Sequence, residues 1–291
     1  MGNEKINKII DLIKWGESFF KEKNIPEPRL NIELMLCNIL NCKRINLYLD
    51  YDKPLNKEEL TILRNFVKRR VQREPLQYIL GETEFMGLKL RVNQSVLIPR
   101  PETELLVEEI INISKKNNGE EITILDIGTG SGNIAISLAK FINHSKIYSI
   151  DSNKDTLKLA KENAEDNYVL DKIIFHELDI LKADELPFNI KFDYIVSNPP
   201  YISIDDYKLL EPELKYEPIL ALTDFNDGFT FYRKILYLSK KNLKKDGAVV
   251  LEMGYNQAEA IKNLFLENNY YDIRVIKDYS NIERIIIGKL Q

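Results

Sequence analysis

Residues 122–139 read ITILDIGTGSGNIAISLA, and this stretch decides the fold class. Its first part, residues 122–128, is a short apolar run typical of a strand that is buried on both faces. Three glycines within residues 128–132 allow the backbone to turn sharply and to approach a ligand closely. Residues 133–142 then carry the apolar spacing of a helix. Strand, glycine-rich loop and helix in this order predict an α/β domain with a parallel sheet.

Strand and helix patterns alternate from this stretch to the end of the chain. The last two strands are separated by only a few residues, so they predict an antiparallel pair. We therefore expect an α/β fold with a seven-stranded Rossmann-like sheet, mostly parallel with an antiparallel last strand, and helices on both faces. Further strands are expected at residues 146–151, 173–179, 192–198, 248–254 and in two segments after residue 269, and helices at residues 155–167, 229–243 and 257–268.

The segment before the sheet has a different pattern. Residues 3–74 repeat apolar side chains at helical spacing, which predicts a small helical bundle. Its last helix is expected to begin after Asn56 as the N-cap, with Glu59 at the capping-box position. Residues 80–93 approximate the alternation of a β-hairpin between the two parts. The predicted division is a helical domain over residues 1–75, a β-hairpin linker over 76–98 and an α/β domain over 99–291.

The composition sets the broad class. The chain has 291 residues, enough for two domains, and its 44% hydrophobic and 30% charged residues are ordinary for a globular protein. No apolar run approaches the ~20 residues that cross a bilayer, and the N-terminus has no apolar signal core. We therefore expect a cytoplasmic protein with no membrane partner. Residues 1–75 hold 15 Lys and Arg against 11 Asp and Glu, whereas the remainder holds 26 against 34.

Cysteine and histidine offer no metal site. Cys37 and Cys42 are five residues apart, which fits neither a CxxC redox pair nor a zinc knuckle. His144 and His176 are far apart and lack neighbouring Cys or carboxylate residues at ligand spacing. A histidine metal centre and a Ser-His-Asp triad are therefore not expected.

The glycine loop and an acidic residue beyond it predict a nucleoside site. Asp151 ends the next strand, 19 residues after Gly132, where a carboxylate can accept both hydroxyls of a ribose. A dinucleotide site needs a third small residue, but Asn133 stands at that position. Asp126 followed by three spaced glycines instead resembles the loop of S-adenosylmethionine-dependent methyltransferases. Asp179 ends the third predicted strand and would lie near the adenine, with Ile180 packing on the base.

The segment Asn198-Pro199-Pro200-Tyr201 follows the fourth predicted strand. Two prolines remove two backbone donors and fix both φ angles, so the carbonyl groups here have no competing N–H in the segment. Asn198 adds a side-chain acceptor and a donor, and Tyr201 adds a flat apolar face. This arrangement suits a planar NH2 group as methyl acceptor. Acceptors at the Asn198 side chain and the Pro199 carbonyl would hold its two N–H bonds and direct its lone pair at the methyl group.

Taken together, these motifs resemble the release factor glutamine methyltransferases, the PrmC/HemK family, over nearly the whole chain. The matching segments are EPLQYILGETEFMGLKLRV and LIPRPETELLVE within residues 74–108, LDIGTGSGNIAISLA at 125–139, DYIVSNPPYI at 193–202 and DGFTFYRKI at 227–235. The resemblance implies methylation of the side-chain amide of the glutamine in the Gly-Gly-Gln loop of class I peptide chain release factors, with S-adenosyl-L-methionine as the methyl donor.

The resemblance also implies which residues act. Asn198, Pro199 and Tyr201 are expected to be catalytic, and Asn198 through Tyr201 to hold the substrate glutamine together with Arg100 and Glu102. Some family members have an aromatic residue at the position of Ile180. Cofactor contacts are implied at Gly128, Thr129, Gly130, Ser131, Gly132, Asp151, Asp179, Ile180 and Asn198.

Two other functions share part of this pattern. A nucleic-acid adenine amino-methyltransferase would also have the glycine loop and the NPPY segment, but it favours a basic channel, and residues 76–291 carry a net charge of -8. A non-catalytic nucleotide-binding module would need only the glycine loop. The helical segment has no catalytic motif and is net positive, so we expect it to dock the release factor. Its run Lys68, Arg69, Arg70 and Arg73 either faces an acidic partner or is a solvated helix face.

Overall fold

The computed structural model describes residues 7–115 and 119–290, so the first part of the predicted helical segment, residues 3–6, lies outside the described residues. The chain divides into two compact units. One is a helical unit that extends to Gly81 and includes Pro212–Tyr216. The other, the sheet unit, comprises Glu82–Glu211 and the chain from Glu217 onward. The helical unit thus ends six residues beyond position 75, because a short additional helix after Pro75 packs with it.

The described helical unit is held together by apolar faces that meet in one core. Gly16 allows close packing of its first two helices, since a Cβ there would come within 2.4 Å of Ile32 Cγ1. Asn56 caps its fourth helix as predicted, and the Glu59 carboxylate accepts a hydrogen bond from the Asn56 N–H. The elements of this unit are α1 (Ile9–Glu22), α2 (Pro28–Leu40), α3 (Arg44–Leu49), α4 (Lys57–Val71), α5 (Leu76–Leu80) and the 3-10 turn Pro212–Tyr216.

The basic run at residues 68–73, at the end of α4 and just after it, is mostly engaged within the helical unit, which contradicts both readings of a free basic face. Arg69 pairs with Glu74 at 2.6 Å. Arg70 is buried, and its Nε donates to Asn31 Oδ1 at 2.8 Å. Arg70 and Arg73 also both contact Glu213 at 3.3 Å. Three of the four cations therefore hold the unit together, and Lys68 alone among them is exposed.

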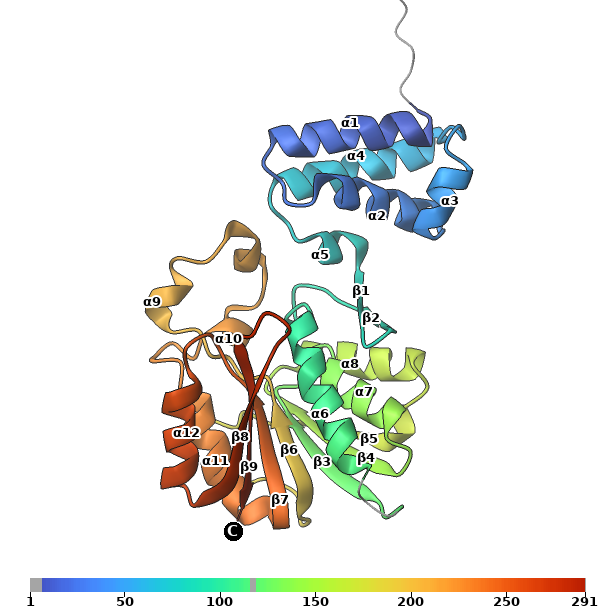
Figure 1. Ribbon diagram of the computed structural model, residues 1–291. Coiled ribbons are helices and arrows are strands. Elements are labelled where there is room, and N and C mark those ends of the chain that lie inside the picture. Colours follow the sequence, from blue (N-terminus) through green and yellow to red (C-terminus); the bar gives the residue numbers. More distant parts are fainter. Residues whose placement is uncertain (1–6, 116–118, 291) are drawn as a thin grey trace, which may run out of the picture. The chain divides into compact units, whose positions relative to one another are not determined.

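The sheet unit has the predicted α/β architecture. Its described residues form a seven-stranded sheet in the order β5-β4-β3-β6-β7-β9-β8, parallel except for β9, which runs antiparallel to both neighbours. Helices α6, α7 and α8 pack on one face, and α11 and α12 on the other (Figure 1). The strands are β3 (Ile122–Ile127), β4 (Ser145–Asp151), β5 (Ile173–Glu177), β6 (Phe192–Ser197), β7 (Leu243–Glu252), β8 (Tyr270–Lys277) and β9 (Glu283–Leu290). The main helices are α6 (Glu104–Ser114), α7 (Asn133–Phe141), α8 (Lys154–Asp166), α11 (Thr230–Asn242) and α12 (Ala258–Glu267).

Shorter elements join this framework. The predicted hairpin is present as β1 (Glu82–Phe85) and β2 (Leu88–Arg91), and its tight turn uses positive φ at Met86 and Gly87. It belongs to the sheet unit, since Phe85 is buried in that unit's core and the Met86 N–H donates to Glu104. The remaining short helices are η1 (Pro101–Thr103), η2 (Leu170–Lys172), α9 (Ile204–Tyr207) and α10 (Ile219–Leu222). Among the residues that the structure describes, no helix combines the length and apolar character needed to cross a membrane.

The strand register brings the important strand ends to one edge. Ile127 is paired with Ile150 of β4 on one side and with Ser197 of β6 on the other, and Ser197 is paired with Leu251 of β7. The strand order reverses at β3, between β4 and β6. A ligand site is expected at such a switch point, outside the carboxyl ends of the strands.

Candidate active site

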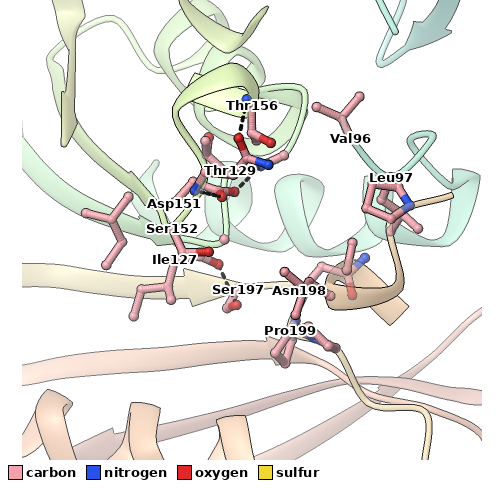
Figure 2. Close-up of a pocket in the computed structure, with 18 of the residues that line it drawn as sticks. Val96, Leu97, Ile127, Thr129, Asp151, Ser152, Thr156, Ser197, Asn198 and Pro199 are labelled. Carbon is pink, nitrogen blue, oxygen red and sulfur yellow. Dashed lines mark hydrogen bonds between the residues drawn. The ribbon is translucent and has the colours of Figure 1, made fainter. Parts of the chain in front are cut away.

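A cavity of about 350 Å³ lies at this edge of the sheet unit. The glycine loop and the end of β4 line one part of it, and the segment after β6 lines another (Figure 2). The volume is in the range of small-molecule sites. Of the residues predicted for the site, the cavity is lined by Arg100, Gly128, Thr129, Gly130, Asp151, Asp179, Ile180, Asn198, Pro199 and Pro200.

The glycine loop leaves its cavity side open. Gly128 and Gly130 have φ of +77° and +54°, and a Cβ built at either would meet no atom within 4 Å. Backbone conformation requires glycine there, and a ligand can approach the main chain. Gly132 does not line the cavity but precedes α7, where a Cβ would come within 2.8 Å of Ile136. Ser131 is also behind the loop, buried to 1% exposure. These two residues therefore support the loop instead of facing the cavity.

Asp151 presents its carboxylate at the end of β4. The oxygens accept from the Gly130 N–H at 3.2 Å and the Asn153 N–H at 3.0 Å, and these bonds fix the side chain at the cavity wall. Burial raises its pKa, while the backbone hydrogen bonds oppose that change. A carboxylate that is held in place and retains accepting capacity fits a ligand with neighbouring hydroxyl groups.

Asp126 does not line the cavity, although it is the second-last residue of β3, the strand before the glycine loop. It is fully buried, its Oδ2 accepts from the Ser149 hydroxyl at 3.0 Å, and its Oδ1 has no partner among the described residues. Burial raises the pKa of Asp126 to about 7. Asp126 and Ser149 therefore act behind the loop, where they join β3 to β4.

The end of β5 supplies a more apolar wall. Asp179 lies two residues beyond the strand and not at its last position as predicted. Its carboxylate is held by Lys182 at 2.8 Å and accepts from the Leu181 N–H at 3.0 Å; these hydrogen bonds, led by that from Lys182, lower its pKa. Ile180 is 5% exposed and lines the cavity beside Leu178. The flat apolar part of a ligand fits this wall better than a charged one.

The segment after β6 turns an amide toward the cavity. Asn198 Nδ2 donates to the Thr103 hydroxyl at 3.1 Å, and Ser197 Oγ donates to the Ile127 carbonyl at 2.6 Å. Asn198 Oδ1 makes no hydrogen bond to the described residues and is left for a ligand. Tyr201 does not line the cavity: its hydroxyl donates to buried Glu252 at 3.4 Å, and its carbonyl accepts from Gln257. In this geometry Tyr201 supports the segment.

Arg100 is anchored by a buried carboxylate. Glu217, 5% exposed, accepts from Arg100 Nη2 and from the Ile98 N–H. Arg100 therefore lines the cavity with a fixed guanidinium. Glu102 is partly exposed and does not line the cavity, so of these two predicted substrate-binding residues the structure brings only Arg100 to the pocket.

Comparisons with known proteins agree with this geometry. Two family models match the chain: the PrmC N-terminal domain over residues 11–81 and a methyltransferase domain over residues 118–287. The release factor glutamine methyltransferase of Chlorobaculum tepidum is 39% identical over 98% of this chain and 98% of its own length. That of Geobacter sulfurreducens is 38% identical over 98% and 96%.

This chain belongs to the release factor glutamine methyltransferase family. Among solved structures, the catalytic domain of hMettl16 superposes with a TM-score of 0.56 at 17% identity, covering 81% of this chain and 83% of that one. At this identity the likeness supports the fold alone. The seven-stranded sheet and the helical N-terminal part expected for a release factor glutamine methyltransferase are both present.

The sequence reasoning missed three residues of this family member that the structure connects to the site. Thr103 and Glu252 form the hydrogen bond behind Asn198, and Glu217 holds Arg100. Thr103 lies inside the motif IPRPETE, and Glu252 is the last residue of a parallel strand. The strand-end rule that selected Asp151 did not select Glu252, because the sequence predicted that this strand continues to residue 254. No sequence signal indicated that Glu217 folds back on Arg100.

Proposed function

We propose that this chain transfers a methyl group from S-adenosyl-L-methionine to the side-chain nitrogen of the glutamine in the Gly-Gly-Gln motif of class I release factors. The relatives above are named for the glutamine of a release factor. The observation that carries the proposal is that Asn198 and Pro199 line the same cavity as Asp151 and the glycine loop. A methyl donor at the loop and an amide at Asn198 would therefore meet in one space.

The residues present fit the donor. Asp151 would accept the ribose hydroxyls, and the open backbone at Gly128 and Gly130 would approach the methionine part. Leu178 and Ile180 would pack against the adenine. When bound, S-adenosylmethionine supplies an electrophilic methyl group on its sulfonium sulfur.

The chain's task in the chemistry is to orient a weak nucleophile. An amide nitrogen shares its lone pair with the carbonyl group, a delocalisation reflected in a rotation barrier of ~18–20 kcal/mol. Asn198 Oδ1 and the Pro199 carbonyl would accept the two N–H bonds, which raises the electron density on nitrogen and holds its lone pair toward the methyl group. The carbon–nitrogen bond would form as the methyl–sulfur bond breaks with its electron pair left on sulfur, and one of these N–H protons would then be released to solvent. Positioning of this kind can supply up to about 7–11 kcal/mol of the barrier.

The helical unit would provide selectivity. A pocket for a glutamine side chain alone could accept many proteins, so discrimination requires contacts elsewhere. We assign these contacts to residues 1–75, as expected from the sequence, but not to the basic run, whose arginines are paired internally. Apolar side chains are exposed on α3 and just after it: Ile45, Tyr48, Leu49 and Tyr51.

The deciding experiment is mass spectrometry of a class I release factor after incubation with enzyme and S-adenosylmethionine. One added methyl group on the Gly-Gly-Gln glutamine is expected. Methylation of RNA or DNA under the same conditions, with none on the release factor, would assign the site to adenine amino groups instead. Cofactor binding with no methyl transfer to any component of a cell extract would reduce the chain to a binding module.

The docking role has its own test. Deleting residues 1–75 is expected to leave cofactor affinity within about threefold but to cut methylation of whole release factor about a hundredfold or more. A short Gly-Gly-Gln peptide should be a weak substrate for both proteins. Leu49→Ser should raise KM for the release factor, whereas Leu266→Ser, on exposed α12 surface, should not. Full-rate methylation by the folded truncated protein would show that the helical unit does not dock the substrate.

A further inference from the structure

The carboxylate of Glu252 is buried without an ionic partner. Glu252 ends β7 and is 2% exposed. Its oxygens accept from two hydroxyl groups, those of Thr103 at 2.6 Å and Tyr201 at 3.4 Å. In the part of the chain that the structure describes, no basic side chain forms an ion pair with it, and Arg284 of β9 is itself bound to Asp278. A buried charge without an ionic partner is costly and is retained mainly where it has a function.

Donor and acceptor chemistry fixes the direction of the hydrogen bonds that connect Asn198, Thr103 and Glu252. An ionised carboxylate only accepts hydrogen bonds, so Thr103 must donate its single proton to Glu252. The Thr103 oxygen can then only accept, and the group that reaches it is Asn198 Nδ2 at 3.1 Å. The amide of Asn198 is thereby fixed with its NH2 toward Thr103 and its oxygen free.

We propose that Glu252 is a positioning residue that acts through Thr103 to present the side-chain oxygen of Asn198 to the substrate. The inference rests on the proposed function, because an NH2 group as methyl acceptor needs an acceptor at Asn198. Reversing the direction of the hydrogen bonds between Asn198, Thr103 and Glu252 would undo this arrangement. If Glu252 donated to Thr103, the Thr103 hydroxyl would be free to donate to Asn198, which would turn the Asn198 NH2 toward the substrate NH2.

The surroundings make such a reversal accessible near neutral pH. The groups that face Glu252 are Glu102 and Thr103 before α6, Tyr201 after β6, Tyr232 of α11 and Arg284 of β9. Burial raises the pKa of Glu252 to about 7; the Thr103 hydrogen bond opposes this, Glu102 adds to it and Arg284 opposes it. Protonation of Glu252 therefore sets the acid limb of turnover: kcat falls as the pH drops below about 7.

The experiment compares Thr103→Val with Thr103→Ser and with a matched control, Thr123→Val. Thr123 also donates to a carboxylate, that of Asp193 at 2.9 Å. Thr123 lies near the start of β3, however, whereas the cavity lies at the other end of this strand. Thr103→Val should lower kcat for release factor at least about tenfold with KM and cofactor affinity within about threefold, whereas Thr103→Ser and Thr123→Val should stay near wild type. An unchanged kcat in folded Thr103→Val would overturn the proposal.

Glu252 is tested by two variants of similar size. Glu252→Gln keeps an oxygen acceptor but cannot ionise, and like the protonated carboxyl it can donate to Thr103; its kcat at pH 8 should therefore fall about tenfold, to the level of protonated wild type, and its acid limb near pH 7 should disappear. Glu252→Met lacks that acceptor, and its kcat should fall about tenfold or more at every pH. Persistence of the acid limb in Glu252→Gln would contradict the proposed role of Glu252.

A spectroscopic signature separates this inference from the proposed function. In protein labelled with 15N-asparagine, the side-chain NH2 signal of Asn198 is identified by its absence in Asn198→Asp. Thr103→Val should shift that signal, and Thr123→Val should not. If wild-type enzyme methylates no release factor, the proposed function fails, and the NMR comparison still decides whether Glu252 and Thr103 orient Asn198. A signal that does not respond to Thr103→Val would overturn the network.

Discussion

Two buried glutamates, one in each unit, have opposite surroundings. Glu33 in α2 is 0% exposed and is bonded to Arg29 at 2.9 Å and also to Arg44 and Tyr48. Burial alone would raise its pKa, but these three partners outweigh burial and lower it. Glu252 is just as buried, is bonded to hydroxyl groups, and has its pKa raised to about 7.

The difference separates a structural charge from a functional one. Glu33 stays ionised because two guanidinium groups compensate for its lost hydration, and it ties α2 to α3. Glu252 lacks such compensation and destabilises the fold when ionised, yet two hydrogen bonds connect it through Thr103 to Asn198. Burial by itself therefore identifies neither role; the identity of the partners does.

The largest expected effect is on the stability of the helical unit. Glu33→Gln removes the negative charge from between two guanidinium groups without leaving a cavity, and the unit should lose about 3 kcal/mol of unfolding free energy. Trp15 in α1 is the single tryptophan, so urea unfolding followed by its fluorescence reports on this unit. Asp52→Asn, in an exposed pair with Lys8, is the control and should leave the midpoint unchanged. Equal midpoints for Glu33→Gln and wild type would mean that the Glu33 cluster does not stabilise the unit.

The next largest expected effect is on kcat, through Asn198 in the sheet unit. Asn198→Ala removes a proposed acceptor for the substrate NH2 and should lower kcat about a hundredfold, with cofactor affinity within about threefold. Steady-state methylation of release factor and calorimetry with S-adenosylmethionine measure the two quantities. Near-normal kcat at saturating substrate would remove Asn198 from the chemistry.

The contributions of the two glutamates to folding stability should also change in opposite directions with pH. The folded pKa of Glu252 lies above its unfolded value, so its contribution to stability is present below pH 4.5 and is lost as the pH rises through about 7. Relative to Glu252→Gln, the free energy of unfolding of wild type should decrease by about 2 kcal/mol between pH 5 and pH 8. Glu33 has a lowered pKa, so its contribution is lost on acidification instead. Urea unfolding by circular dichroism across this range measures the difference; parallel curves for wild type and Glu252→Gln would contradict the raised pKa.

The smallest expected effect is on cofactor affinity, through the two acids at the end of β4 and just after β5. Asp151→Ala removes the carboxylate that faces the cavity at the end of β4 and should weaken S-adenosylmethionine binding about tenfold, or ~1.4 kcal/mol. Asp179→Ala should change affinity less than about threefold, because that carboxylate is already paired with Lys182. A larger loss for Asp179→Ala than for Asp151→Ala would reverse the assignment of the two acids.

The sequence alone determined the features that local patterns encode. Apolar runs and helical spacing predicted the sheet's seven strands, the hairpin before it and the capped helix at Asn56, because burial and capping depend on residues close in the chain. The glycine loop, Asp151 and Asn198 were also predictable, since each lies at the end of a strand or directly after it, and parallel strands end at a common edge.

Tertiary structure decided what depends on distant partners. Thr103 meets Glu252 across 149 positions, Arg100 meets Glu217 across 117, and Arg70 meets Glu213 across 143. These contacts turned a basic run into internal ion pairs, moved Tyr201 away from the cavity and gave Asn198 its orientation. A hydrogen bond or a pKa depends on which groups the fold encloses together, and nothing in the spacing of residues along the chain specifies that.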